Sequence, residues 1–119
     1  MNATELYQET MVTTQNKGRL VIMLYKGAIN FLKQAIIAIQ DRDYNKKGRL
    51  LAKVQDIILE MNLVLDTEAG GQLAINLRRL YNYMWNRLTV ANNKCDSDIL
   101  REVIALLEEL NKGWTSIEI

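Results

Sequence analysis

Residues 65–88 read LDTEAGGQLAINLRRLYNYMWNRL and contain a chain reversal followed by a helix. The reversal ends at Gly70 and Gly71, because paired glycines permit positive φ and a close approach of the backbone to its neighbours. From Gln72 onward, apolar residues recur at helical spacing and predict a helix from about residue 72 to 91. Its expected inward-facing set is Leu73, Leu77, Leu80, Tyr81, Met84 and Leu88.

Three further helices are predicted on either side of this one. The first spans about residues 17–40 with Asn16 as its N-cap, and the second about residues 44–65. The last begins at a cap on Asp96 or Ser97 and ends near Trp114. Connections this short place consecutive helices antiparallel. Residues 1–15 show no sustained period, so we expect an all-α antiparallel four-helix bundle at 16–119, with a loosely ordered N-terminal arm at 1–15.

The amino-acid composition argues against several classes of function. The 119 residues carry 15 Lys plus Arg against 14 Asp plus Glu, without the basic excess typical of a nucleic-acid binder. The chain has no His and a single cysteine, Cys95, which excludes histidine chemistry and an internal disulfide. No carboxylate pair, phosphate loop or ligand cluster stands out, so we expect no enzyme, no metal and no cofactor. Without a signal peptide or a long apolar run, we expect a cytoplasmic protein without membrane insertion.

The first helix carries more apolar surface than one bundle core requires. One stripe is expected to be core and consists of Leu20, Leu24, Ala28, Phe31, Ala35 and Ala38. A second stripe, rotated by about 110° at 100° per residue, consists of Ile22, Tyr25, Ile29, Leu32 and Ile36. Three interpretations fit: a central helix with neighbours on two sides, a homodimer through the spare stripe, or a groove for a partner helix. The residues that we expect to be buried in the bundle core are Leu24, Phe31, Leu77, Leu80, Val103 and Leu110.

The third helix adds candidates for recognition. Tyr81 and Trp85 offer large rigid side chains with a polar tip, which suit both core packing and interfaces. Asn76 is a poor residue for a helix interior, so its amide is expected to bind either a local group or a bound chain.

Several motifs occur in a fixed order along the chain. Leu20, Met23, Leu24, Tyr25, Gly27 and Ala28 match L-x-x-M-L-Y-D-G-A, with Lys26 in place of Asp. The segment from Gly70 to Asp96 matches G-G-x-x-A-x-N-L-x-x-L-Y-x-Y-M-x-x-R-L-x-x-A-N-x-x-x-D. In this set the chain resembles the flagellin export chaperone family (FliS), although Asn16 and Lys17 stand where that family usually has Ser-Pro.

The resemblance implies a protein that binds the disordered C-terminal segment of flagellin, prevents premature polymerisation and delivers it to the cytoplasmic domain of the flagellar export gate. It implies client binding through the second stripe and the third helix, at Ile22, Tyr25, Ile29, Leu32, Ile36, Asn76, Tyr81 and Trp85. It also implies an N-terminal lid or export-gate contact at Leu6, Tyr7 and Met11. We expect a monomer or weak dimer. The alternative is a structural homodimer or a helical regulator of another protein.

Overall fold

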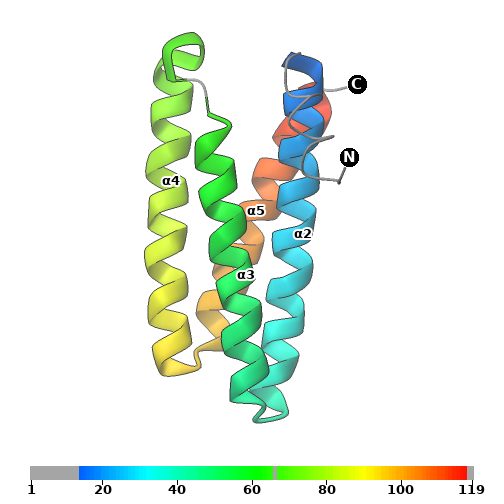
Figure 1. The fold of residues 1–119 in the computed structure, drawn as a ribbon, viewed down its shortest axis with the longest axis vertical. Helices are drawn as coiled ribbons and strands as arrows, with labels where there is room; N and C mark the ends of the chain where they lie inside the picture. The colour runs from blue at the N-terminus through cyan, green and yellow to red at the C-terminus, as the bar shows by residue number, and fades with distance from the viewer. Residues whose placement is uncertain (1–13, 66, 118–119) are drawn as a thin grey trace, which may run out of the picture.

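Four α-helices form an up-and-down bundle in a computed structural model that describes residues 14–65 and 67–117 (Figure 1). They are α2 (Thr14–Gln40), α3 (Tyr44–Leu63), α4 (Thr67–Lys94) and α5 (Ser97–Ile117). The described residues contain no strand. Helix α2 contacts α3 and α5, and α4 contacts the same two helices, so α2 and α4 lie on a diagonal. The predicted antiparallel four-helix bundle is confirmed.

Helix α2 uses both of its apolar stripes because it packs against two neighbours. Toward α3, Lys53 Nζ lies 5.2 Å from the centroid of the Phe31 ring. Toward α5, the Lys33 ammonium lies 4.0 Å from the Glu108 carboxylate. The central-helix interpretation therefore accounts for apolar residues on two faces of α2, whose packing against α3 and α5 buries part of both stripes.

The buried line of α2 runs between the two predicted stripes. Its members are Val21, Tyr25, Ala28, Leu32, Ala35 and Ala38. Leu24 and Phe31, which we expected in the core, are only partly buried against it. The bundle axis lies between the contacts with α3 and α5, so the residues that point toward it come from both stripes. Elsewhere Leu77 and Val103 are buried as predicted, whereas Leu80 and Leu110 are partly buried.

One predicted N-cap is wrong, one is confirmed, and a third, at Asp43, was not predicted. Helix α2 begins at Thr14, so Asn16 lies within the helix and the predicted N-cap is wrong. The Asp43 carboxylate caps α3 by accepting the Lys46 backbone N–H at 3.2 Å. Asp96 Oδ1 caps α5 in the same way, accepting the backbone N–H groups of Asp98 at 3.0 Å and Ile99 at 3.3 Å.

The Gly70-Gly71 pair has a conformational requirement at each position. Gly71 adopts φ 56° and ψ −133°, which joins a short helical turn to the main part of α4 at a kink. A Cβ on Gly70 would lie 2.8 Å from the Ala74 Cβ, so a side chain there would clash. The predicted positive φ at this pair is confirmed at Gly71.

By length and composition, the segment Gly18–Gln40 of α2 meets the test for a helix that could cross a membrane. The core helix of a bundle meets the same test. Here the apolar side chains of α2 pack against α3 and α5, which gives its hydropathy a structural cause.

Candidate partner-binding surface at one end of the bundle

An open apolar hollow of about 270 Å³ lies where the start of α2, the α3–α4 connection and the end of α5 meet. Glycine and alanine at four lining positions leave this space, because their side chains are too small to fill it. No ionisable side chain is among the residues that line it. They are Gly18, Val21, Val64, Leu65, Ala69, Gly70, Leu73, Ala74, Leu77 and Trp114.

A second hollow of about 200 Å³ opens beside the first, between α4 and α5. The two share Leu73, Leu77 and Trp114 as a common wall. The remaining lining residues of the second hollow are Glu109, Leu110 and Gly113. We call the two hollows together the end surface.

Leu73 is the side chain that makes this surface unusual. It lines both hollows, yet 63% of it is exposed to solvent. The inward position predicted for Leu73 is therefore wrong, because its side chain lies over the open hollows and not in the packed core. A large exposed leucine beside an open apolar lining is a typical feature of a site for an apolar partner.

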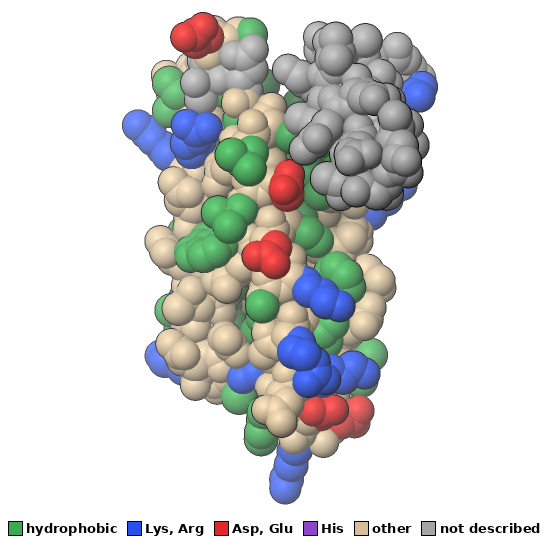
Figure 2. Space-filling view, viewed as in Figure 1, with side chains coloured by type: hydrophobic (Ala, Val, Ile, Leu, Met, Phe, Trp, Pro, Cys, Tyr) green, Lys and Arg blue, Asp and Glu red, His purple; other side chains and the backbone are tan. Residues whose placement is uncertain are grey.

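The face in Figure 2 offers a useful contrast to the end surface. Hydrophobic side chains there form separate groups over α3 and α4, with acidic side chains between them. On α3, for example, Leu59 and Leu63 are 48% and 76% exposed, and Glu60 follows Leu59 directly in sequence. Neither leucine is among the residues that line the two hollows. The end surface remains the stronger candidate.

Beneath the end surface, a hydrogen-bonded aromatic cluster crosses the bundle. The hydroxyls of Tyr25 and Tyr81 lie 2.5 Å apart, and Trp114 Nε1 donates to the Tyr25 hydroxyl oxygen at 3.0 Å. The two phenol rings meet edge to face, with centroids 6.4 Å apart. Burial raises the pKa of both tyrosines above the ordinary value of 10.0, so both stay neutral at physiological pH.

This cluster corrects part of the predicted client-binding set. Tyr25 and Leu32 are fully buried and Tyr81 is 1% exposed, so none of the three presents a surface to a client. The physical reason is the diagonal placement of α2 and α4, whose separation is filled by two phenol rings. Each hydroxyl is satisfied by the other, which lowers the cost of burying it.

The other members of the predicted client-binding set are not among the residues that line the end surface. Ile22, Ile29 and Ile36 are partly exposed, and the last two pack against the core. Asn76 is exposed, and its Oδ1 accepts a local hydrogen bond from Gln72 Nε2 at 2.9 Å. The structure therefore does not gather the predicted residues into one site. The role of these four in client binding stays a prediction.

Trp85 is half-buried and packs against the core, away from both hollows, and its client role also stays a prediction. Leu6, Tyr7 and Met11 lie outside the described residues, so the predicted lid or export-gate contact stays a prediction as well. Sequence analysis missed Val21, Leu65 and Trp114 as parts of an open surface. The small residues around Gly70 were the available signal.

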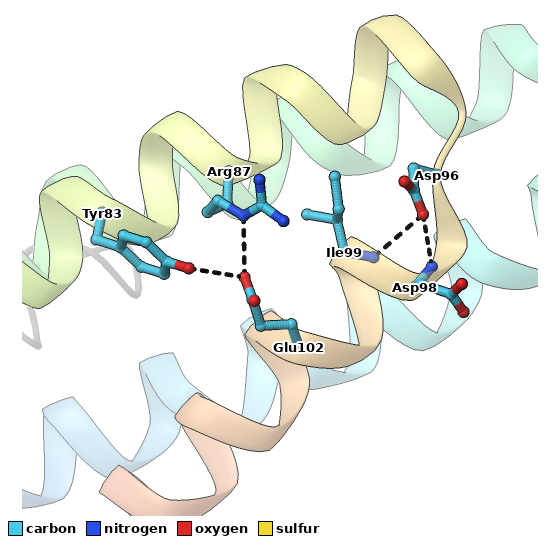
Figure 3. Close-up of polar contacts among 6 residues, drawn as sticks. All are labelled: Tyr83, Arg87, Asp96, Asp98, Ile99 and Glu102. Atoms are coloured by element: carbon cyan, nitrogen blue, oxygen red, sulfur yellow. Dashed lines mark hydrogen bonds and ion pairs between the residues drawn. The ribbon is translucent and has the colours of Figure 1, made fainter.

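A second polar cluster joins α4 to α5 on the outside of the bundle (Figure 3). Arg87 Nε donates to Glu102 Oε1 at 3.0 Å, and the Tyr83 hydroxyl donates to the same oxygen at 3.2 Å. The side chains of Arg87 and Glu102 are 34% and 40% exposed, so the ion pair contributes little stability. We interpret this cluster as helix-to-helix packing.

At the opposite end of the bundle, a buried lysine caps the C-terminal end of α4. Lys47 Nζ donates to the Asn92 carbonyl oxygen at 2.8 Å and to Cys95 Sγ at 3.4 Å. The lysine is 7% exposed, and its charge complements the partial negative charge at the C-terminal end of a helix. Across the described residues, no three His, Cys, Asp or Glu side chains come close enough to hold a metal ion.

Comparison with known proteins finds similarity along the whole chain. The profile of a family described as "Flagellar protein FliS" matches residues 1–119. Flagellar secretion chaperone FliSB of Pseudomonas aeruginosa is 40% identical over 121 residues, which cover 98% of this chain and 96% of the relative. Flagellar secretion chaperone FliS of Bacillus subtilis is 34% identical, covering 95% and 84%. The FliS of Salmonella typhimurium is 36% identical, covering 92% and 82%.

Proposed function

The chain belongs to the FliS family of flagellar secretion chaperones, as its motifs predicted, and on this basis we propose that its client is the C-terminal segment of flagellin. In this proposal the chaperone acts in the cytoplasm, keeps the segment from polymerising too early and delivers it to the flagellar export gate. The family is non-enzymatic, so the predicted absence of an enzymatic activity is confirmed by family membership.

The observation that supports client binding is the end surface, with Leu73 63% exposed above two apolar hollows. A disordered segment with helical apolar periodicity gains free energy by placing its apolar side chains there. It also loses conformational entropy as it folds on the chaperone, so the net affinity stays moderate. Moderate affinity allows release at the export gate without nucleotide hydrolysis.

Replacing Leu73 by aspartate tests this proposal. Fully burying a leucine contributes about 1.5–3 kcal/mol, and about two thirds of Leu73 is still available for burial. Losing that contact and placing a carboxylate on the apolar lining is expected to weaken binding at least tenfold, or about 1.4 kcal/mol. The measurement is calorimetric titration with the last ~40 residues of the cognate flagellin, a length suggested by the family resemblance and by a rise of ~1.5 Å per helical residue along the bundle.

Ile37→Asp is the matched control. Ile37 is 55% exposed on α2, near the end of the bundle away from the hollows (Figure 1). It therefore introduces the same charge at a similarly exposed apolar position. We expect its affinity to stay within about twofold of the unmodified chain. Equal affinities for the two variants would exclude the end surface as the client site.

A further inference from the structure

The indole of Trp114 belongs to the wall that the two hollows of the end surface share. Of the three residues that line both hollows, Leu73 and Leu77 come from α4 and Trp114 comes from α5. The first hollow extends from this wall toward α2, and the second extends along α5. Trp114 is therefore the one α5 side chain that contributes to the shape of both hollows.

A single directional interaction fixes that ring. An indole has one hydrogen-bond donor, Nε1, and in Trp114 it donates to the Tyr25 hydroxyl at 3.0 Å. Tyr25 is fully buried, and its own ring is held edge to face against Tyr81. Trp114 itself is only half-buried. A rigid, buried acceptor thus orients a partly exposed ring.

We infer that Trp114 divides the end surface into two subsites, which receive two apolar side chains from one helical turn of the client, and that Tyr25 is the residue that positions Trp114. The inference rests on the proposed function, because the client is the flagellin segment. Atoms in contact with opposite faces of a ring lie about 7–8 Å apart, twice the contact distance of about 3.5–4.0 Å. Side chains three or four residues apart on a helix start about 5–6 Å apart at Cβ and can diverge to straddle the ring.

Tyr25→Phe and Tyr81→Phe form a matched pair that separates positioning from general core stability. Each variant removes one hydroxyl from the same buried hydroxyl pair and keeps the ring. Tyr25→Phe also removes the acceptor of the indole N–H, whereas Tyr81→Phe leaves it in place. We expect the midpoint of thermal unfolding to decrease for both variants, and to decrease more for Tyr25→Phe, which breaks two hydrogen bonds rather than one.

Affinity for the C-terminal ~40 residues of flagellin is expected to divide the pair. Calorimetry should show a three- to tenfold loss for Tyr25→Phe and a loss below about twofold for Tyr81→Phe. Equal losses would overturn the role of Tyr25. If the unmodified chain does not bind the peptide, the proposed function fails and the inference fails with it. If it binds and the pair does not separate, only the inference fails.

A fluorescence measurement tests the wall directly and does not require the Tyr25 variant to fold. The sequence has two tryptophans, so Trp85→Phe leaves Trp114 as the single reporter. Peptide binding should move its emission to shorter wavelength and reduce quenching by acrylamide at least twofold, because apolar side chains then cover both faces of the ring. Unchanged Trp114 fluorescence at peptide concentrations where calorimetry shows saturation would overturn the inference.

Discussion

Leu32→Ala tests the position of α2 in the bundle. Leu32 belongs to the stripe that sequence analysis placed on the client surface, yet it is 0% exposed. Truncation to alanine removes three buried carbons, which at about 0.8 kcal/mol each gives about 2.4 kcal/mol of lost transfer free energy. The cavity left in a packed core adds to this. We therefore expect the free energy of unfolding to fall by about 3–5 kcal/mol, within the range of such substitutions.

Ile37→Ala provides the comparison on the same helix. Ile37 is 55% exposed, and alanine has the higher helix propensity, so the lost contact is largely offset. We expect a change within about 0.5 kcal/mol. Both variants can be measured by urea titration followed by circular dichroism at 222 nm, with stability taken from the midpoint at constant slope.

The result that would refute the packing is specific. If Leu32→Ala costs less than about 1 kcal/mol, or as little as Ile37→Ala, then Leu32 lies on the surface and α2 is rotated relative to the structure. The stripe of Ile22, Ile29 and Ile36 would then return as the leading candidate for client binding.

Three further predictions use the same urea titration. Gly71→Ala should destabilise the bundle by about 1–3 kcal/mol, because φ 56° with ψ −133° is strained for any residue with a Cβ. Gly48→Ala should instead stabilise it by about 0.5–1 kcal/mol, because Gly48 lies inside α3 and an added Cβ would meet no atom within 4 Å. Lys47→Met keeps the buried stem but removes the charged hydrogen bond to the end of α4, and should cost about 1–2 kcal/mol after relief of ammonium desolvation; no loss would show that the cap contributes nothing. The folded-state pKa values of Tyr25 and Tyr81 lie above 10.0, so the folded state binds more protons than the unfolded state at alkaline pH. The free energy of unfolding should therefore fall above about pH 10 by about 1.4 kcal/mol per pH unit per tyrosine. The double Tyr→Phe variant should lose less, and an equal loss would contradict the burial of the hydroxyls.

Local signals in the sequence were sufficient to predict the four helices, but not to predict which face of α2 points into the core. Helical periodicity and short connections predicted the bundle, and Gly70-Gly71 predicted a backbone position with positive φ. A helix with apolar residues on two faces has no unique inward direction, because the direction depends on where the neighbouring helices lie. Tyr25 and Leu32 were misplaced for that reason, since their stripe faces both α5 and the bundle axis.

The end surface could not be predicted because it is an absence of side chains. Gly18 belongs to α2, whereas Ala69 and Gly70 belong to α4, and they leave space only because the starts of α2 and α4 and the end of α5 converge. Sequence patterns indicate what fills a core, whereas a hollow depends on the relative positions of helices that are far apart in the sequence. Sequence analysis placed the end of the last helix near Trp114, and the place of this residue in the wall that the hollows share depends on the three-dimensional arrangement.

The two ends of the bundle differ in how the chain closes them. At one end, the turns joining α2 to α3 and α4 to α5 lie together (Figure 1), and Lys47 caps α4 there. At the other end, the first turns of α2 and the last turns of α5 lie beside the α3–α4 connection, and helix termini fray more readily than their middles. The hollows are therefore lined largely by helix ends, whereas two turns and the Lys47 contact hold the opposite end of the bundle together.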